Sequence, residues 1–180
     1  RLPIREHGGM PYLWLVYAAG IPVSLVGVHA ARLVAFQLAL LAAFLVCYAL
    51  GFGRRGRTAL AYAAAMALLG ILASPSDGWA TTYFVYGATF LAWGLSASNA
   101  YRALAVYTPL VALVLWLLHV PVVSSVYGVV FSVIVGIACI NAAEQRRAHS
   151  RLQQAYEQNE RLAKIAERER IARDLHDVLG

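Results

Sequence analysis

The chain has 180 residues, of which 61% are hydrophobic and 13% are charged, whereas about 25% of the residues of an ordinary soluble domain are charged. Six ionised residues fall between positions 11 and 141, and the last 39 residues carry fifteen. These values exclude a soluble globular protein and indicate a membrane domain joined to a short water-exposed segment. The net charge of +6 does not indicate nucleic-acid binding, because the basic residues stand at the ends of apolar segments and form no stripe with interleaved aromatic residues.

Six apolar segments follow one another along the first 141 residues. A helix that crosses the hydrocarbon core needs about 20 apolar residues, and we expect each segment to be helical because lipid offers no partner to backbone amides. The predicted fold class is therefore all-α, a multi-pass transmembrane bundle over residues 1–141. Because the third segment is short and the junction at Pro121 is tight, five spans with one long bent helix are the alternative. The segments are residues 11–28, 33–52, 58–73, 79–97, 103–120 and 122–140.

The arginines predict the orientation of this bundle. With six spans, the loops place nine arginines on one side of the membrane and a single one, Arg32, on the other. Loops on the cytoplasmic side carry an excess of basic residues. We therefore predict that both termini are cytoplasmic. The nine arginines are Arg1, Arg5, Arg54, Arg55, Arg57, Arg102, Arg146, Arg147 and Arg151.

Polar residues inside the predicted spans are candidates for sensing, because a polar group in lipid costs free energy unless it faces a partner. Ordinary helix packing through small residues is the competing interpretation. The candidates are Ser24, Gln37 and Ser132 inside the spans, and Asn99 and Asn141, which we expect at the membrane interface rather than at depth.

The sequence contains few residues that suit a metal ion. His29, Asp77 and His119 all fall on the predicted outer side, where three such residues from three loops would make a weak metal or pH-sensing site. Cys47 and Cys139 lie inside apolar runs without the spacing of metal ligands, so we expect both to behave as small buried hydrophobic residues. No metal site is predicted.

Residues 142–166 are expected to form one long helix that leaves the membrane. From Glu144 to Arg173 there is no Gly or Pro, and the residues are mostly good helix formers. Two heptad registers share Leu162 but give it different positions, and polar residues weaken both. We predict a two-stranded coiled coil of marginal stability that carries a signal; a solvated spacer is the alternative. The registers are Ala148, Leu152, Ala155, Asn159, Leu162, Ala166, and Leu162, Ile165, Glu169, Ala172, His176.

The string ERERIARDLHD at residues 167–177 resembles the phosphoacceptor box of bacterial sensor histidine kinases, in the subfamily that partners LuxR/NarL-type response regulators and includes DesK-like membrane sensors. The resemblance implies that residues 167–180 begin a dimerisation and phosphoacceptor domain. It also implies that His176 is the phosphorylated nucleophile and Asp177 its acid/base partner. An unperturbed histidine, with a pKa of about 6.5, is mostly neutral near pH 7 and has a free lone pair for attack.

The same resemblance implies a reaction and its participants. ATP and Mg²⁺ would be bound by a catalytic domain that we expect beyond Gly180, and the phosphoryl group would pass from His176 to an aspartate of the response regulator. The protein would be a homodimer in the bacterial inner membrane. Two other classes remain open: a small transporter or channel subunit with a coiled-coil tail, and a non-catalytic receptor whose tail only dimerises.

Overall fold

The computed structural model describes residues 30–51, 56–75 and 78–179, together with Ala18, Gly20 and Arg54. The side chains of residues 172 and 174–178 also lie outside the description. The chain divides into two compact units, Arg1–Asn141 and Ala142–Gly180, at the position where the apolar sequence ends. The first predicted span, residues 11–28, lies outside the described residues except for Ala18 and Gly20.

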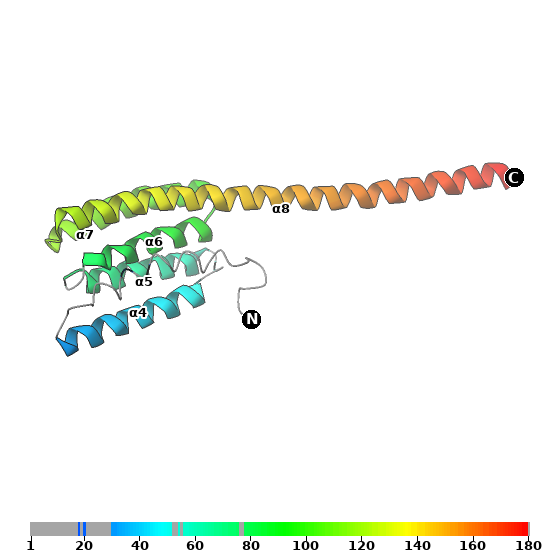
Figure 1. Cartoon of the computed structure of the whole chain (residues 1–180). Coiled ribbons are helices and arrows are strands. Elements are labelled where there is room, and N and C mark those ends of the chain that lie inside the picture. Colours follow the sequence, from blue (N-terminus) through cyan, green and yellow to red (C-terminus); the bar gives the residue numbers. More distant parts are fainter. Residues whose placement is uncertain are drawn as a thin grey trace. The chain divides into compact units, whose positions relative to one another are not determined.

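The described residues form α-helices and one short 3-10 helix, with no strand among them (Figure 1). The all-α prediction is thus confirmed for this part of the chain. Three of these helices, α4, α7 and α8, contain a stretch long and apolar enough to cross a membrane. The elements are α4 (Ala31–Gly51), α5 (Arg57–Ala73), η2 (Gly78–Ala80), α6 (Thr81–Gly94), α7 (Ala97–Leu117) and α8 (Val122–Leu179).

The boundary between α6 and α7 differs from the prediction. The sequence pattern placed one helix over 79–97 and began the next at 103, whereas α6 ends at Gly94 and α7 begins at Ala97. Leu95 and Ser96 between them are extended. Gly is favoured just after a helix and Ser just before one, so Gly94 and Ser96 carried a boundary signal that the continuous apolar run concealed. At 14 residues, α6 is about 21 Å long, shorter than the roughly 30 Å hydrocarbon core.

A tight turn separates α7 from α8. His119 has a φ of 54°, and its N–H donates to the carbonyl of Trp116 while the N–H of Val120 donates to that of Leu115. These two bonds with a left-handed residue form the Schellman motif that ends helices. Pro121, whose carbonyl accepts from the N–H of Ser125, then starts α8. The two helices are therefore distinct, and the single bent helix of the five-span alternative is wrong.

Helix α6 occupies the centre of the first unit, since 12 of its 14 residues are buried. One of its faces packs on α4 and α5 through aromatic side chains, which we call the aromatic core. Phe44 is fully buried, with ring centroids 4.8 Å from Tyr86 and 5.5 Å from Tyr83. Edge-to-face pairs at these distances stabilise the packing beyond the area that they bury. The aromatic core consists of Phe44, Tyr48, Tyr62, Tyr83, Tyr86 and Phe90.

A different kind of interface joins α6 to α7 and to the first part of α8. Most of its side chains are small, and we call it the small-residue seam. Small side chains allow helices to approach closely without interlocking. The small-residue seam consists of Ala88, Ala92, Ala100, Leu104, Cys139 and Ile140.

The outer surfaces of α4, α7 and the first part of α8 are apolar. Leu38, Val46, Leu110, Val123 and Ile134 are each at least half exposed. A soluble monomer seldom exposes contiguous apolar surface of this extent. Together with the lengths of these helices, the exposed surface is compatible with a unit that contacts a bilayer.

Candidate functional site

Three of the described arginines of the first unit lie at one end of its helices, which we call the basic end. Arg54 follows α4, Arg57 opens α5, and Arg102 lies in the second turn of α7. The N–H of Gly56 donates to the carbonyl of Gly94 at 2.9 Å, so the start of α5 and the end of α6 meet there. Arg32 lies in the first turn of α4, at the opposite end of that helix. The grouping follows from helices that alternate in direction.

The polar residues predicted inside the spans have unequal surroundings. Gln37 and Ser132 are buried, whereas Asn99 and Asn141 are exposed and Ser24 lies outside the described residues. The two buried residues lie on different helices, Gln37 on α4 and Ser132 on α8. They are therefore separate candidates.

Sequence reasoning missed two further buried hydroxyl groups. Thr81 and Thr82 open α6 and are both almost fully buried, and neither hydroxyl has a hydrogen-bond partner among the described residues. Thr81 faces Gly128 of α8, where an added Cβ would lie 2.8 Å from the Cβ of Thr81. Threonine reads as a weakly apolar residue in a hydropathy profile, which is why its burial gave no separate signal.

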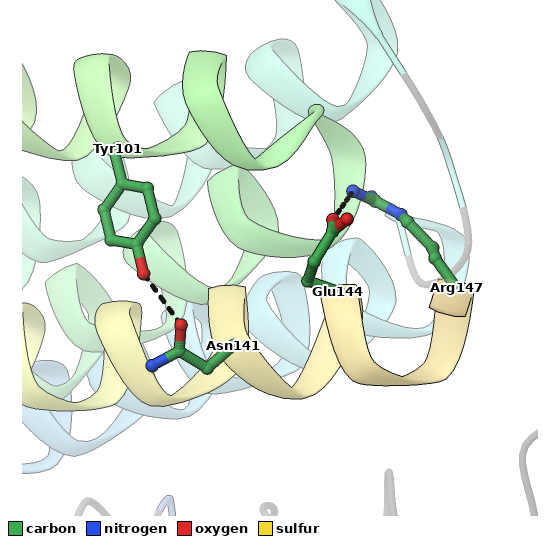
Figure 2. Close-up of polar contacts among 4 residues, drawn as sticks. All are labelled: Tyr101, Asn141, Glu144 and Arg147. Atoms are coloured by element: carbon green, nitrogen blue, oxygen red, sulfur yellow. Dashed lines mark hydrogen bonds and ion pairs between the residues drawn. The ribbon is translucent and has the colours of Figure 1, made fainter. Parts of the chain in front are cut away.

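One polar contact joins α7 to α8 at the basic end. The hydroxyl of Tyr101 donates to Oδ1 of Asn141 at 2.8 Å (Figure 2). The sequence marked Asn141 but not Tyr101, since a tyrosine near a predicted span end is equally typical of an interfacial aromatic belt. Asn141 is the last residue of the first unit, so this bond lies where the membrane part of α8 ends.

The second unit is a single helical segment supported by local charge pairs. Lys164 Nζ lies 2.6 Å from Glu160 Oε1, and Arg170 lies 2.8 Å from Glu167. Figure 2 also shows the first pair of this kind, between Arg147 and Glu144 at 3.6 Å. Oppositely charged residues three or four apart stabilise a helix by about 0.2–0.5 kcal/mol each. These pairs, together with the good helix formers of the segment, support a helix that has no core of its own.

Every residue from 148 to 171 is exposed in this single chain. Large apolar side chains are among them, and exposing a row of such side chains to water is unfavourable. The row includes members of both predicted heptad registers. The exposed large apolar residues of the second unit are Leu152, Tyr156, Leu162, Ile165, Ile171 and Leu179.

The predicted site residues His176 and Asp177 belong to the last turns of α8. Their backbone is helical, and their side chains lie outside the description. Arg173, three residues before His176, is exposed, and residues three apart share a helix face. The helix thus carries both predicted residues near its C-terminal end, beyond the last described ion pair.

Of the predicted outer-face trio, the structure describes His119 alone. His119 is exposed in the turn before α8, while His29 and Asp77 lie outside the description. Among the side chains that the structure does describe, no group of three or more His, Cys, Asp or Glu residues could hold a metal ion. Of the two cysteines, Cys139 is buried in the small-residue seam and Cys47 is half-buried.

Comparison of the chain with protein families, with curated proteins and with solved structures finds no match in any of the three.

Proposed function

We propose that this chain is the membrane-sensing part of a dimeric histidine kinase, in which the state of the bundle controls ATP-dependent phosphorylation of His176. The phosphoryl group would then pass to an aspartate of a LuxR/NarL-type response regulator. In this proposal the six predicted segments cross a bacterial inner membrane, and both termini lie in the cytoplasm. The grouping of Arg54, Arg57 and Arg102 at the basic end supports that orientation.

One observation carries the proposal. The string at 167–177, which resembles a phosphoacceptor box, lies in the same helix, α8, as an apolar stretch long enough to cross a membrane. Between the two, the residues from 148 to 171 expose an apolar row that suits a second copy of the same helix. A helix of this composition supports the interpretation of a sensor connected to a dimeric reaction site.

The proposed chemistry needs two neighbouring groups. A neutral imidazole nitrogen of His176 would form a bond to the γ-phosphorus of ATP while the bond from that phosphorus to the ADP oxygen breaks. The carboxylate of Asp177 would accept the proton from the other ring nitrogen, and positioned acid/base groups of this kind contribute about 10²–10⁴-fold to a rate. Transfer to the response regulator would then break the phosphorus–nitrogen bond.

The resemblance at residues 167–177 concerns the segment that accepts the phosphoryl group. We therefore assign ATP and Mg²⁺ to a separate catalytic domain, to which His176 would be presented as the acceptor.

Phosphorylation tests the proposal directly. The full-length protein in membranes, given labelled ATP, should gain a phosphate that is stable in alkali and labile in acid, and His176→Ala should abolish it. The matched control is His149→Ala, because His149 lies in the same helix but is followed by Ser150. Label that persists in His176→Ala, or that disappears in His149→Ala, would contradict the assignment.

Orientation has its own test. Reporter fusions at Gly56 and Arg147 should report the cytoplasm, and fusions at Asp77 and Ser124 the external side. This pattern is expected because the bundle alternates helix directions and places the arginines of its loops at the basic end. An external signal at Gly56 would reverse the proposed orientation.

A further inference from the structure

The hydrogen bond between Tyr101 and Asn141 is exposed, and its exposure limits its strength. Both residues are accessible, so water competes for the donor and the acceptor. The net effect of such a bond on an equilibrium is about two- to tenfold. It is therefore strong enough to bias a conformational equilibrium and weak enough to open and close.

Helix α7 has a weak point in its middle. Pro109 lies inside the helix and has no N–H to donate to the carbonyl of Ala105. One residue earlier, the hydroxyl of Thr108 donates to the carbonyl of Leu104 at 2.8 Å, a contact that tends to bend helices. Kinks in helices are found at such positions. We therefore divide α7 into an N-terminal segment, residues 97–104, and the remainder of the helix.

The weak point is anchored to the central helix. The hydroxyl of Tyr107 donates to the carbonyl of Phe84 at 2.8 Å, and Gly87 makes room for it, because a Cβ at Gly87 would overlap that hydroxyl. Beyond this anchor, the remainder of α7 packs on Phe84 through Val111 and Leu115. The anchor fixes α7 to α6 next to Pro109, as a pivot requires.

The N-terminal segment of α7 touches α8 at two places. Leu104 packs against Gly136, where an added Cβ would lie 2.9 Å from the leucine methyl groups. One turn and a half further along α8, Asn141 receives the hydrogen bond from Tyr101. Two contacts, separated along both helices, thus hold residues 97–104 beside residues 136–141.

The same two segments meet α6 mainly through the small-residue seam, at whose edge Trp93, Leu95 and Val135 also pack. Ala103 packs in addition against the buried cluster that contains the aromatic core. Four of the six buried residues of the seam are alanine or cysteine, and such small side chains interlock less than large ones do. Sliding or tilting across such a surface meets a lower barrier than movement within the aromatic core, where rings fill the spaces between one another. The seam can therefore change its packing while α4, α5 and α6 stay fixed.

We propose that residues 97–104 of α7 and residues 136–141 of α8 move as one body about the pivot at Tyr107 and Pro109, and that the Tyr101–Asn141 hydrogen bond is the latch that couples them. Ala142, which follows Asn141 directly, is the first residue of the second unit. In the context of the proposed function, on which this step rests, the latched body transmits the state of the bundle to the helix that carries His176.

The latch can be tested on the chain itself in lipid nanodiscs, without any kinase assay. Spin labels are placed at Ser98 and Ala138, both exposed, in a background with Cys47→Ala and Cys139→Ala, and their distance distribution is measured. We expect one narrow distribution in the starting protein. Tyr101→Phe and Asn141→Ala should each add a second, longer population and change the ratio of the two populations by about two- to tenfold.

Matched variants separate the latch from general damage. Asn141→Asp keeps an acceptor for the Tyr101 hydroxyl and should preserve the narrow distribution, as should Tyr156→Phe, which removes an exposed hydroxyl in the second unit. The double variant Tyr101→Phe/Asn141→Ala should resemble either single variant, because both remove the same bond. An unchanged distribution in Tyr101→Phe, or equal broadening in Tyr156→Phe, would overturn the latch.

A second label pair tests the pivot and a third measurement tests the output. Labels at Val46 of α4 and Ala138 should give a broader distribution of distances than the first pair, and Pro109→Ala should narrow it by restoring the helical hydrogen bond.

Phosphorylation of His176 should change about two- to tenfold, in the same direction, in both Tyr101→Phe and Asn141→Ala. If the spin labels show the latch but the protein is never phosphorylated, the proposed function is refuted and the latch stands. If the latch variants show normal phosphorylation and unchanged distances, the latch is refuted and the proposed function stands.

Discussion

The two parts of helix α8 have the same secondary structure for different reasons. Residues 122–141 pack against α6 and α7, with Ser132, Cys139 and Ile140 buried. Residues 148–171 are exposed throughout and rely on charge pairs such as Glu160–Lys164. The first part is held by tertiary contacts, whereas the second is held by helix propensity and local ion pairs.

Because of this difference, substitutions in the two parts of α8 should affect different properties of the protein. In the first part, a change of side-chain volume should alter the stability of the bundle, since a packed interior responds even to one methylene group. In the second part, most single changes should leave the fold of the chain intact and alter only association or chemistry. Substitutions in the two parts should therefore affect different measurements.

The largest expected effect is chemical and falls in the second part. Asp177→Asn retains the shape of the side chain but removes the proposed proton acceptor, so the rate of His176 phosphorylation should fall about 10²–10⁴-fold. Helicity and the stability of the bundle should not change. Glu157→Gln, which neutralises another carboxylate of the same helix, is the control; a near-normal rate in Asp177→Asn would remove this residue from the mechanism.

The next effect concerns the aromatic core. Phe44→Ala should lower the unfolding free energy of the bundle by about 3–5 kcal/mol, because the fully buried ring leaves a cavity between α4 and α6. Val46→Ala, on the exposed face of the same helix, should change it by no more than about 0.5 kcal/mol. Denaturant titration in mixed micelles measures both. Equal losses would show that the two faces of α4 are packed alike.

A smaller effect is expected from the two heptad registers. Asn159→Leu favours the first and Glu169→Leu the second, and each buried leucine should stabilise the dimer by up to about 1.5–3 kcal/mol. Because a two-state element responds only to interactions that differ between its states, kinase output should move in opposite directions. Gln154→Leu, outside both registers, is the control. Equal outputs that still respond to stimulus would support the spacer alternative.

The smallest effect tests the local origin of helicity in the second part. Glu160→Gln removes an exposed ion pair whose side chains are 66% and 70% accessible, and such pairs contribute about 0.3–0.5 kcal/mol. Amide hydrogen exchange near residues 160–164 should therefore accelerate by about twofold, and less at high salt. The amides of residues 132–140, protected by packing, should exchange as before.

The sequence predicted helix bounds most accurately where hydropathy and clear boundary residues agree. The apolar segments identified α4 and α5 to within two residues at each end, because their apolar runs are bounded by arginines or by Ser-Pro. It failed at α6 and α7, where the run from Trp79 to Ala97 has no charge and the break at Gly94 depends on two residues. The turn at His119, which follows the end of α7 at Leu117, was equally hidden, since a left-handed histidine has no distinct sequence signal.

The residues of the candidate site also differ in whether the sequence identified them. His176 and Asp177 are identified by a short string of residues, and Asn141 by its polarity at the end of an apolar run. Tyr101, Tyr107 and the two threonines that open α6 were not identified, because a hydroxyl on an amphipathic side chain has meaning only once its partner is known. Tyr107 is informative through the carbonyl of Phe84 and the space at Gly87, which lie on another helix.

The sequence by itself determined the helical class of the described chain, the division near Asn141, and the polar, self-supporting character of residues 142–179. Hydropathy, charge and propensity are properties of neighbours in the chain, and they suffice for these. Only the tertiary structure decided that the short α6 is the central helix, that rings pack on one side of it and alanines on the other, and that Tyr101 meets Asn141. Those contacts join residues far apart in the sequence, and their energies depend on shape and distance.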